Sequence, residues 1–205
     1  MSRPRENDKR RTIALRAAEV LQQEGLDLSM TALAQHLGLK RPTLLYHFKS
    51  YAEIVVLALE SLLIEQTRFL LARINEYEHP LDRVYARVRA VHEYHRDQEE
   101  RIVFLSQAIA TFGRDRMADI FAVGNRVFEA HRAAQARQVK QGIEDGIIRP
   151  CDVDALMALI RSVTDGLLIQ RVVTGTPYEP VHTFLWQHIL EPLKISPSNK
   201  DEGTP

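Results

Sequence analysis

The sequence is poor in the features that mark secreted, membrane and fibrous proteins. Its 205 residues include one cysteine, Cys151, so neither an intrachain disulfide nor a cysteine cluster for zinc can form. Nine glycines and nine prolines are too few for a fibrous or low-complexity chain, and no apolar stretch approaches the roughly 20 residues of a membrane span. The charged start MSRPRENDKRR precedes no apolar segment of the kind found in secretory signals. We therefore expect a globular cytoplasmic protein.

The short motifs of common enzyme classes are also missing. The sequence contains no glycine-rich phosphate loop, no G-x-S-x-G nucleophile elbow and no HExxH zinc motif. His92 and His95 lie three residues apart, a spacing that can place two metal ligands on one helix face. Two histidines without a defined third ligand are a weak metal signature. We expect no enzymatic activity, no cofactor and no metal site.

The net charge is zero, but the charges are unevenly distributed. Residues 1–50 carry nine Lys and Arg against five Asp and Glu, a net charge of +4, so the remainder carries −4. This asymmetry is expected when one end of a protein meets phosphates. Five bases near the N-terminus either form an arm along the DNA or a solvated tail: Arg3, Arg5, Lys9, Arg10 and Arg11.

Apolar residues recur at intervals of three and four through most of the chain, which predicts an all-α protein. We expect a helix-turn-helix DNA-binding domain over residues 1–50, a helical ligand-sensing and dimerisation domain over 51–195, and a disordered tail over 196–205. The expected helices cover about 8–24, 30–37, 41–48, 50–75, 81–95, 98–112, 115–144, 153–175 and 178–191.

The helix-turn-helix pattern consists of two short helices joined by Gly38-Leu39-Lys40 and preceded by a longer one. Ser29 is expected to cap the second helix, and Ser50 and Glu53 to form a capping box in which each side chain binds the other's backbone N–H. Leu44 and Phe48 are one turn apart and should face the core. The residues left for DNA contact are Thr31, Lys40, Arg41, Pro42, Thr43, Leu45, Tyr46, His47 and Lys49.

The exposed side of the third helix carries groups that can read a major groove. Arg41 can donate two hydrogen bonds to a guanine edge, Thr43 can reach a phosphate or a base, and Pro42 or Leu45 can touch a thymine methyl. Thr31, at the start of the second helix, can bind the DNA backbone through its hydroxyl.

The stretch from Ile13 to Glu53 contains, in order, Ala17-Ala18, Glu24-Gly25, Ser29-Met30, Leu33-Ala34, Leu37-Gly38 and Thr43-Leu44-Leu45-Tyr46-His47-Phe48-Lys49-Ser50. This stretch resembles the N-terminal domain of the TetR family of transcriptional repressors. Gly146–Pro150, before an Asp-capped helix containing Asp165-Gly166-Leu167, resembles many of the family's sensor domains. Leu45 and Tyr51 depart from the pattern where family members often carry residues that contact the DNA backbone.

The resemblance implies a homodimer that binds a palindromic DNA operator and is released by a small-molecule effector. It implies backbone contacts for Tyr46, His47 and Lys49. The last two long helices are expected to pack against their symmetry mates, and the candidates are Leu159, Val163, Leu167, Phe184 and Ile189, which can equally serve the subunit's own core.

Aromatic residues at helical spacing in the body either line an apolar ligand cavity or belong to the core: Phe104, Phe112, Phe121 and Phe128. Gln107, His92 and Arg132 are candidate polar anchors for such a ligand. Two other interpretations stay open. One is an all-helical small-molecule- or metal-binding protein without specific DNA binding, suggested by His92 and His95. The other is a nonspecific architectural DNA-binding protein, suggested by the basic N-terminus.

Overall fold

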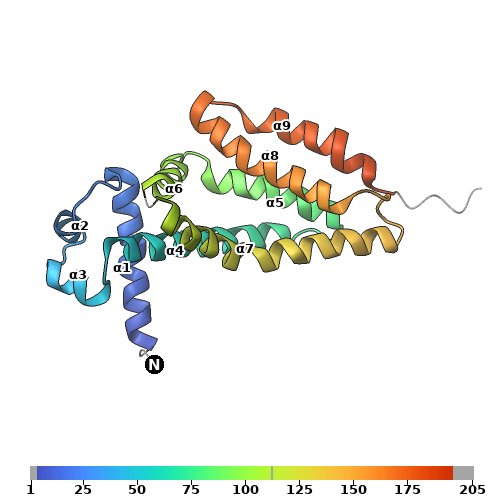
Figure 1. Ribbon diagram of the computed structural model, residues 1–205. Helices are drawn as coiled ribbons and strands as arrows, with labels where there is room; N and C mark the ends of the chain where they lie inside the picture. Colours follow the sequence, from blue (N-terminus) through green and yellow to red (C-terminus); the bar gives the residue numbers. More distant parts are fainter. Residues whose placement is uncertain (1–3, 112, 196–205) are drawn as a thin grey trace, which may run out of the picture. The chain divides into compact units, whose positions relative to one another are not determined.

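The computed structural model describes residues 4–111 and 113–195 (Figure 1). Arg3, Phe112 and the tail 196–205, predicted to be disordered, lie outside the described residues. The described secondary structure is helical apart from one isolated bridge between Ile148 and Lys194, which confirms the predicted all-α class.

The chain packs as two units. The first, here called the head unit, comprises Met1–Arg68 and His95–Glu129, and the second, the body unit, comprises Phe69–Tyr94 and Ala130–Pro205. This division follows packing and differs from the boundary at residue 50. The functional division between a DNA-binding domain and a sensing domain stays a prediction.

The head unit contains α1 (Pro4–Glu24), α2 (Met30–His36), α3 (Arg41–His47), the first part of α4 (Tyr51–Ile74), α6 (Glu100–Thr111) and the first half of α7 (Gly113–Glu144). Helix α1 begins four residues earlier than predicted, because proline is tolerated in a first helical turn. The core of the unit contains Leu44 and Phe48, both fully buried as expected, and the α6 residues Phe104 and Ala108 pack into the same core.

The turn between α2 and α3 has the predicted chemistry. The Ser29 hydroxyl accepts a hydrogen bond from the Ala32 N–H at 3.1 Å and caps α2. Gly38 adopts φ +65°, a left-handed conformation that costs other residues about 1–2 kcal/mol. The Leu39 N–H then donates to the Ala34 carbonyl at 2.8 Å, which closes the end of α2. The chain is thereby redirected within three residues into α3.

The body unit contains the end of α4, α5 (Pro80–His95, all but its last residue), the second half of α7, α8 (Val153–Thr174) and α9 (Tyr178–Phe184). Asp152 caps α8 as expected, accepting from the Ala155 N–H at 3.0 Å. The predicted last helix over 178–191 is wrong in one respect: after Phe184 it continues as a π-helix, Leu185–Leu190, and a 3₁₀ turn, Glu191–Leu193. Pro192 has no N–H with which to extend a regular α-helix.

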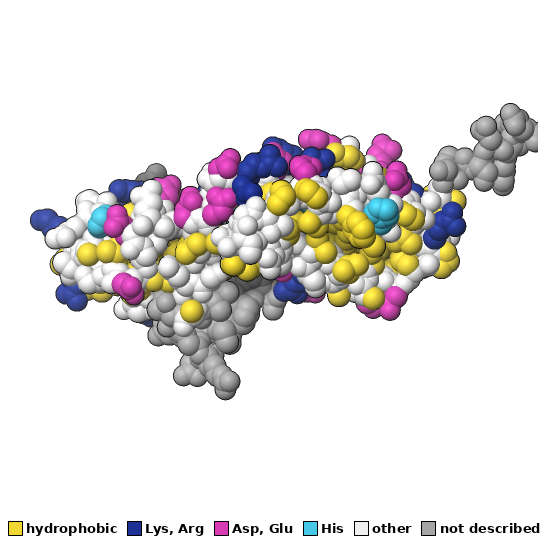
Figure 2. Space-filling view, turned by 90° about the horizontal axis from the view of Figure 1, so that it is seen from above, with side chains coloured by type: hydrophobic (Ala, Val, Ile, Leu, Met, Phe, Trp, Pro, Cys, Tyr) yellow, Lys and Arg dark blue, Asp and Glu magenta, His cyan; other side chains and the backbone are white. Residues whose placement is uncertain are grey.

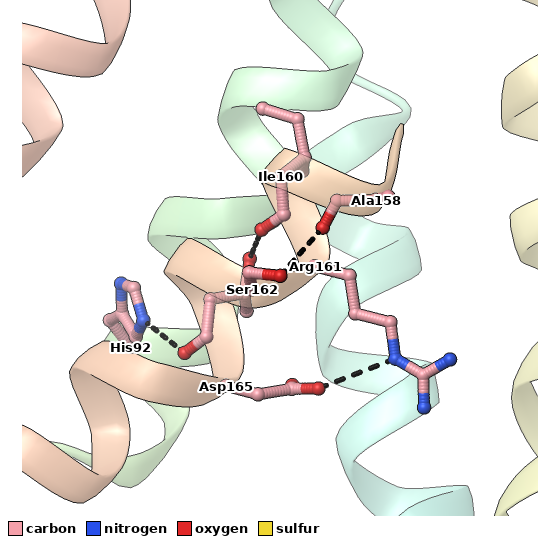
Figure 3. Close-up of polar contacts among 7 residues, drawn as sticks. His92, Ala158, Ile160, Arg161, Ser162 and Asp165 are labelled. Carbon is pink, nitrogen blue, oxygen red and sulfur yellow. Dashed lines mark hydrogen bonds and ion pairs between the residues drawn. The ribbon is translucent and has the colours of Figure 1, made fainter. Parts of the chain in front are cut away.

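Two buried histidines lie inside the body unit. His92 Nδ1 is 2.7 Å from His182 Nε2. His92 Nε2 is 2.9 Å from the Thr164 carbonyl of α8, the contact drawn as a dashed line from His92 in Figure 3. A carbonyl only accepts, so His92 Nε2 carries the proton, and in the neutral ring Nδ1 accepts from His182. The Tyr178 ring stacks on His92 with a centroid distance of 4.7 Å. Both nitrogens of His92 are therefore used in packing α5 against α8 and α9.

This arrangement makes the stability of the body unit depend on pH. Burial lowers the pKa of His92, and the bond to the Thr164 carbonyl and the charge of Asp165 oppose this only in part. Because the pKa of His92 is lower in the folded than in the unfolded protein, protonation below the ordinary histidine pKa of about 6.5 favours the unfolded state. The folded protein therefore has its full stability above that pH and loses stability as the pH falls below it. We expect the free energy of unfolding to decrease from pH 7 to 5, and less steeply in His92→Gln.

Urea unfolding at a series of pH values measures both slopes. His131→Gln is the matched control, because His131 is exposed on α7. Equal slopes for the wild type and His92→Gln would contradict this account.

Candidate nucleic-acid interface

Helix α3 presents most of the predicted DNA-contacting residues to solvent. Arg41 and Pro42 are exposed, Tyr46 is 74% exposed and Leu45 39% exposed, while Thr43 is half-buried. Lys40 precedes the helix, Lys49 follows it, and Thr31 lies in the first turn of α2; all three are exposed. The opposite side of α3 is anchored by the fully buried Leu44. The head unit therefore holds a basic and aromatic surface on a packed core.

His47 is placed differently from its neighbours. It is only 8% exposed, and its ring meets Tyr46 edge to face at a centroid distance of 5.1 Å. Its Nδ1 is buried and has no hydrogen-bond partner among the described residues. The burial indicates a packing role that supports Tyr46, and a contact between His47 and DNA stays a prediction.

The Glu53 carboxylate joins three segments of the head unit. One oxygen pairs with Arg10 of α1, and the other accepts the Lys49 N–H at 2.7 Å, just beyond α3. The Ser50 hydroxyl accepts the Glu53 N–H at 3.3 Å, as the capping box requires. The reciprocal half of that box was predicted wrongly, because Glu53 binds the N–H of Lys49 and not that of Ser50.

Arg10 is consequently fixed and is not part of a free basic arm. Its guanidinium pairs with Glu53 and lies over the Phe48 ring, 5.3 Å from the centroid. Arg10 of α1 thus contacts both Phe48 and Glu53, the two ends of the segment that follows α3. The N-terminal bases were predicted as an arm or a tail, and for Arg10 the structure shows a third role.

Two further bonds hold the helix-turn-helix from its sides. Arg16 Nη2 of α1 donates to the Leu37 carbonyl at the end of α2, at 2.8 Å. The Tyr51 hydroxyl donates to the Leu26 carbonyl at 3.1 Å, and burial, with a smaller contribution from the charge of Asp27, raises the pKa of Tyr51 to about 12. Tyr51 therefore remains protonated and bound within the head unit. Tyr51, which departs from the pattern of the resemblance, thus has a structural role through its hydrogen bond to Leu26.

The body unit contains a second group of charged residues. Arg87 of α5 is half-buried and donates to Gln135 of α7 at 3.0 Å. Burial lowers the pKa of Arg87, as do the nearby charges of Arg132 and Arg161, whereas Asp165 raises it. Arg161 and Asp165 pair along α8 at 3.4 Å (Figure 3). Positive charge thus predominates among the groups acting on Arg87.

The predicted ligand-binding residues are divided between the units. His92 and Arg132 belong to the body unit, while Phe104, Gln107, Phe121 and Phe128 belong to the head unit. Phe104 is 1% exposed within the head-unit core, Gln107 is exposed, and Phe128 and Arg132 are half-buried. The Phe121 side chain lies outside what the structure describes. Their common role in ligand binding stays a prediction.

The predicted dimer residues differ strongly in exposure. Phe184 is 59% exposed and Leu159 43%, whereas Leu167 is buried and Val163 and Ile189 pack against the body core. Apolar side chains gather over this part of the body unit in Figure 2. Three exposed apolar residues of α8 were not among the predicted dimer residues: Ile169, Val172 and Val173. Their signal was a second apolar stripe beside the buried one formed by Leu156 and Ile160.

The metal interpretation receives no support from His92 geometry, because both ring nitrogens are already hydrogen-bonded. Within residues 4–111 and 113–195, no three His, Cys, Asp or Glu side chains converge as metal ligands. A search of the same residues for a helix able to cross a membrane also found none.

Comparison with family models identifies the surface around α3. Residues 13–57 match the model of the bacterial regulatory proteins of the tetR family, a segment that contains α2, α3 and the Glu53 junction. Residues 13–57 are therefore similar to the N-terminal domain of tetR-family regulatory proteins. This confirms the resemblance inferred from the sequence. A comparison with curated proteins found no match.

Solved structures, among them a TetR-family regulator, share the fold over most of the chain. The regulator PfmR from Thermus thermophilus is 21% identical, with a TM-score of 0.64, and the match covers 87% of this chain and 97% of PfmR. FadR from Bacillus subtilis in complex with stearoyl-CoA is 16% identical, with a TM-score of 0.69, covering 89% and 96%. AibR in complex with isovaleryl coenzyme A and operator DNA is 17% identical, with a TM-score of 0.61, covering 85% and 93%. The chain therefore has the TetR-family fold.

The junction made by Glu53 can be tested directly. Glu53→Gln removes the charge that pairs with Arg10 but keeps an oxygen that can accept the Lys49 N–H. Since the pair is about one-third exposed, we expect a loss of about 1–2 kcal/mol in the free energy of unfolding, measured by urea denaturation. Glu19→Gln, on the exposed side of α1, should be neutral. A fully stable Glu53→Gln protein would show that the junction contributes little.

Proposed function

We propose that this protein is a transcriptional repressor that binds a palindromic operator as a homodimer and is released by a small-molecule effector. The observation that carries the proposal is the exposed surface of α3, with Arg41 and Tyr46, in a segment that matches the TetR family. Hydrogen bonds made by the side chains of Glu53, Arg16 and Tyr51 connect the helices around that surface. A surface held in this way is suited to insertion into a major groove.

The residues divide by the part of DNA that they can reach. Arg41, in the first turn of α3, can bind a guanine edge with two hydrogen bonds, which specifies a base. Thr31, Lys49 and Tyr46 can contact phosphates, which fixes the position of the helix but carries no sequence information. Pro42 and Leu45 add apolar contacts to a thymine methyl. Sequence preference should therefore depend on Arg41 more than on Lys49.

A dimer is needed because one short helix covers too few base pairs for useful specificity. Two symmetric copies can read half-sites in successive major grooves, about 34–36 Å apart or a multiple of that distance. The apolar side chains exposed on α8 and at the end of α9, including Leu159, Val173 and Phe184, support a self-complementary interface in this region.

The effector is proposed to bind in the helical part of the chain beyond residue 50. Structures with this fold contain isovaleryl coenzyme A and stearoyl-CoA, which supports a ligand with an acidic group and an apolar part. Arg132, whose charge acts on Arg87, supports the same class of ligand. The effector is proposed to bind more tightly to a conformation in which the two α3 helices of the dimer no longer match the spacing of successive major grooves. A coupling free energy of about 1–3 kcal/mol between effector and DNA binding changes operator affinity by about 5–150-fold.

Selection of bound fragments from random DNA tests the function, and a palindromic consensus is expected. Binding of that site should be about 10³–10⁷ times tighter than binding of random sequence. Arg41→Ala should cost about 1–3 kcal/mol and relax the preference at one position in each half-site, measured by competition binding. Lys49→Ala should weaken binding to all DNA sequences equally, and should reduce the slope of the logarithm of affinity against the logarithm of salt concentration by about one.

Equal affinity for all sequences would favour an architectural DNA-binding protein. Absence of salt-dependent DNA binding, together with a metal in the purified protein, would favour the metal-binding alternative. Either result would contradict the proposal.

The dimer interface has its own test. Val173 is 71% exposed on α8, so Val173→Asp leaves the subunit core intact but places a charge in the proposed apolar interface. We expect the variant to sediment as a monomer at concentrations where the wild type is a dimer, and to lose operator affinity. Val103→Asp, at a 40% exposed site of α6, should remain a dimer. A dimeric Val173→Asp protein would place the interface elsewhere.

A further inference from the structure

The head unit contains a cavity that the proposed function does not use. It has a volume of about 290 Å³ and lies between the N-terminal part of α1 and the middle of α4. Arg10 and Arg11 line it from α1, and Leu57, Ser61 and Ile64 line it from α4. Sites for drug-sized ligands begin at roughly this size, so the occupant must be small.

The chemistry of the lining is uneven. Leu57 and Ile64 provide an apolar wall, and Ser61 is 1% exposed beside them. Both cations are on α1. Arg11 is half-buried and makes no ion pair with any described residue. Glu60 also lines the cavity, and its negative charge opposes that of an anionic ligand, so the two cations exceed the acidic groups of the lining by one charge.

Arg10 is held so that only part of its guanidinium is used. Nη2 pairs with Glu53, whereas Nε is buried and has no hydrogen-bond partner among the described residues. A buried N–H without a partner carries a desolvation cost that an acceptor in the cavity would remove. The Arg10 Nε–H can donate to a second acceptor while Nη2 stays on Glu53, because each guanidinium nitrogen carries its own N–H.

We propose that this cavity is a second ligand site, for a small monoanion such as an aromatic or short-chain carboxylic acid. The carboxylate binds Arg10 Nε and the Arg11 guanidinium, and the apolar part lies against Leu57 and Ile64. The ligand connects α1 to α4 and holds Arg10 against Glu53, which also accepts the Lys49 N–H at the end of α3. Binding here therefore strengthens the support of the α3 surface, opposite in sign to an effector that releases DNA.

Benzoate is the probe, with benzamide as its neutral counterpart of the same shape and inorganic phosphate as an anion without an apolar part. We expect benzoate to bind the DNA-free protein about tenfold or more tighter than benzamide by calorimetry, and to shift the NMR signal of the Arg10 Nε–H. At saturation, benzoate should raise operator affinity about fivefold or more. Phosphate binding as tight as benzoate binding would contradict the proposed contribution of Leu57 and Ile64 to affinity.

Two variants locate the site. Arg11→Gln should weaken benzoate about tenfold, because it removes one cation without disturbing an ion pair in the described structure. Leu57→Phe should fill the cavity and abolish binding. Lys9→Gln, a neighbouring exposed residue of α1 that does not line the cavity, is the control and should bind like the wild type.

Wild-type affinity in Arg11→Gln would overturn the proposal even if Leu57→Phe failed to fold. Equal binding of benzoate and benzamide would also overturn it. Since binding is measured without DNA, these outcomes do not depend on whether the protein is a repressor.

Discussion

The orientation of α3 depends on one carboxylate. Glu53 binds Arg10 of α1 on one side and the backbone N–H of Lys49 on the other, so the end of α3 and the start of α4 are fixed to the same helix. Arg10 also lies over Phe48, the fully buried residue that closes α3. A short helix of seven residues has little stability of its own. The exposed surface of α3 is thus positioned by contacts behind it.

Local signals explain why much of the head unit could be predicted. The spacing of Leu33, Leu44 and Phe48 fixes which side of each helix is buried, and Gly38 fixes the turn because few other residues accept its conformation. Ser29 and Asp152 cap helices through atoms only three residues away. These contacts involve residues that are close together in the sequence, so hydrophobic periodicity and helix-capping rules can predict them.

The contacts that were missed join residues far apart in the sequence. Arg10 and Glu53 are separated by 43 positions, His92 and His182 by 90, and Arg87 and Gln135 by 48. Their side chains have several possible partners in an unfolded chain, and only the packing of whole helices selects one. His47 shows the same limit. Its place in the motif suggests a DNA contact, yet the tertiary structure buries it beside Tyr46.

Helix α4 has a mechanical consequence. It runs without interruption from Tyr51 to Ile74, its sequence contains neither glycine nor proline, and its residues contribute to both units. With a rise of 1.5 Å per residue, such a helix behaves as a stiff rod over tens of ångströms. Its N-terminal end carries Tyr51 and Glu53, so a rotation of this end about the helix axis would move both contacts behind α3 at once.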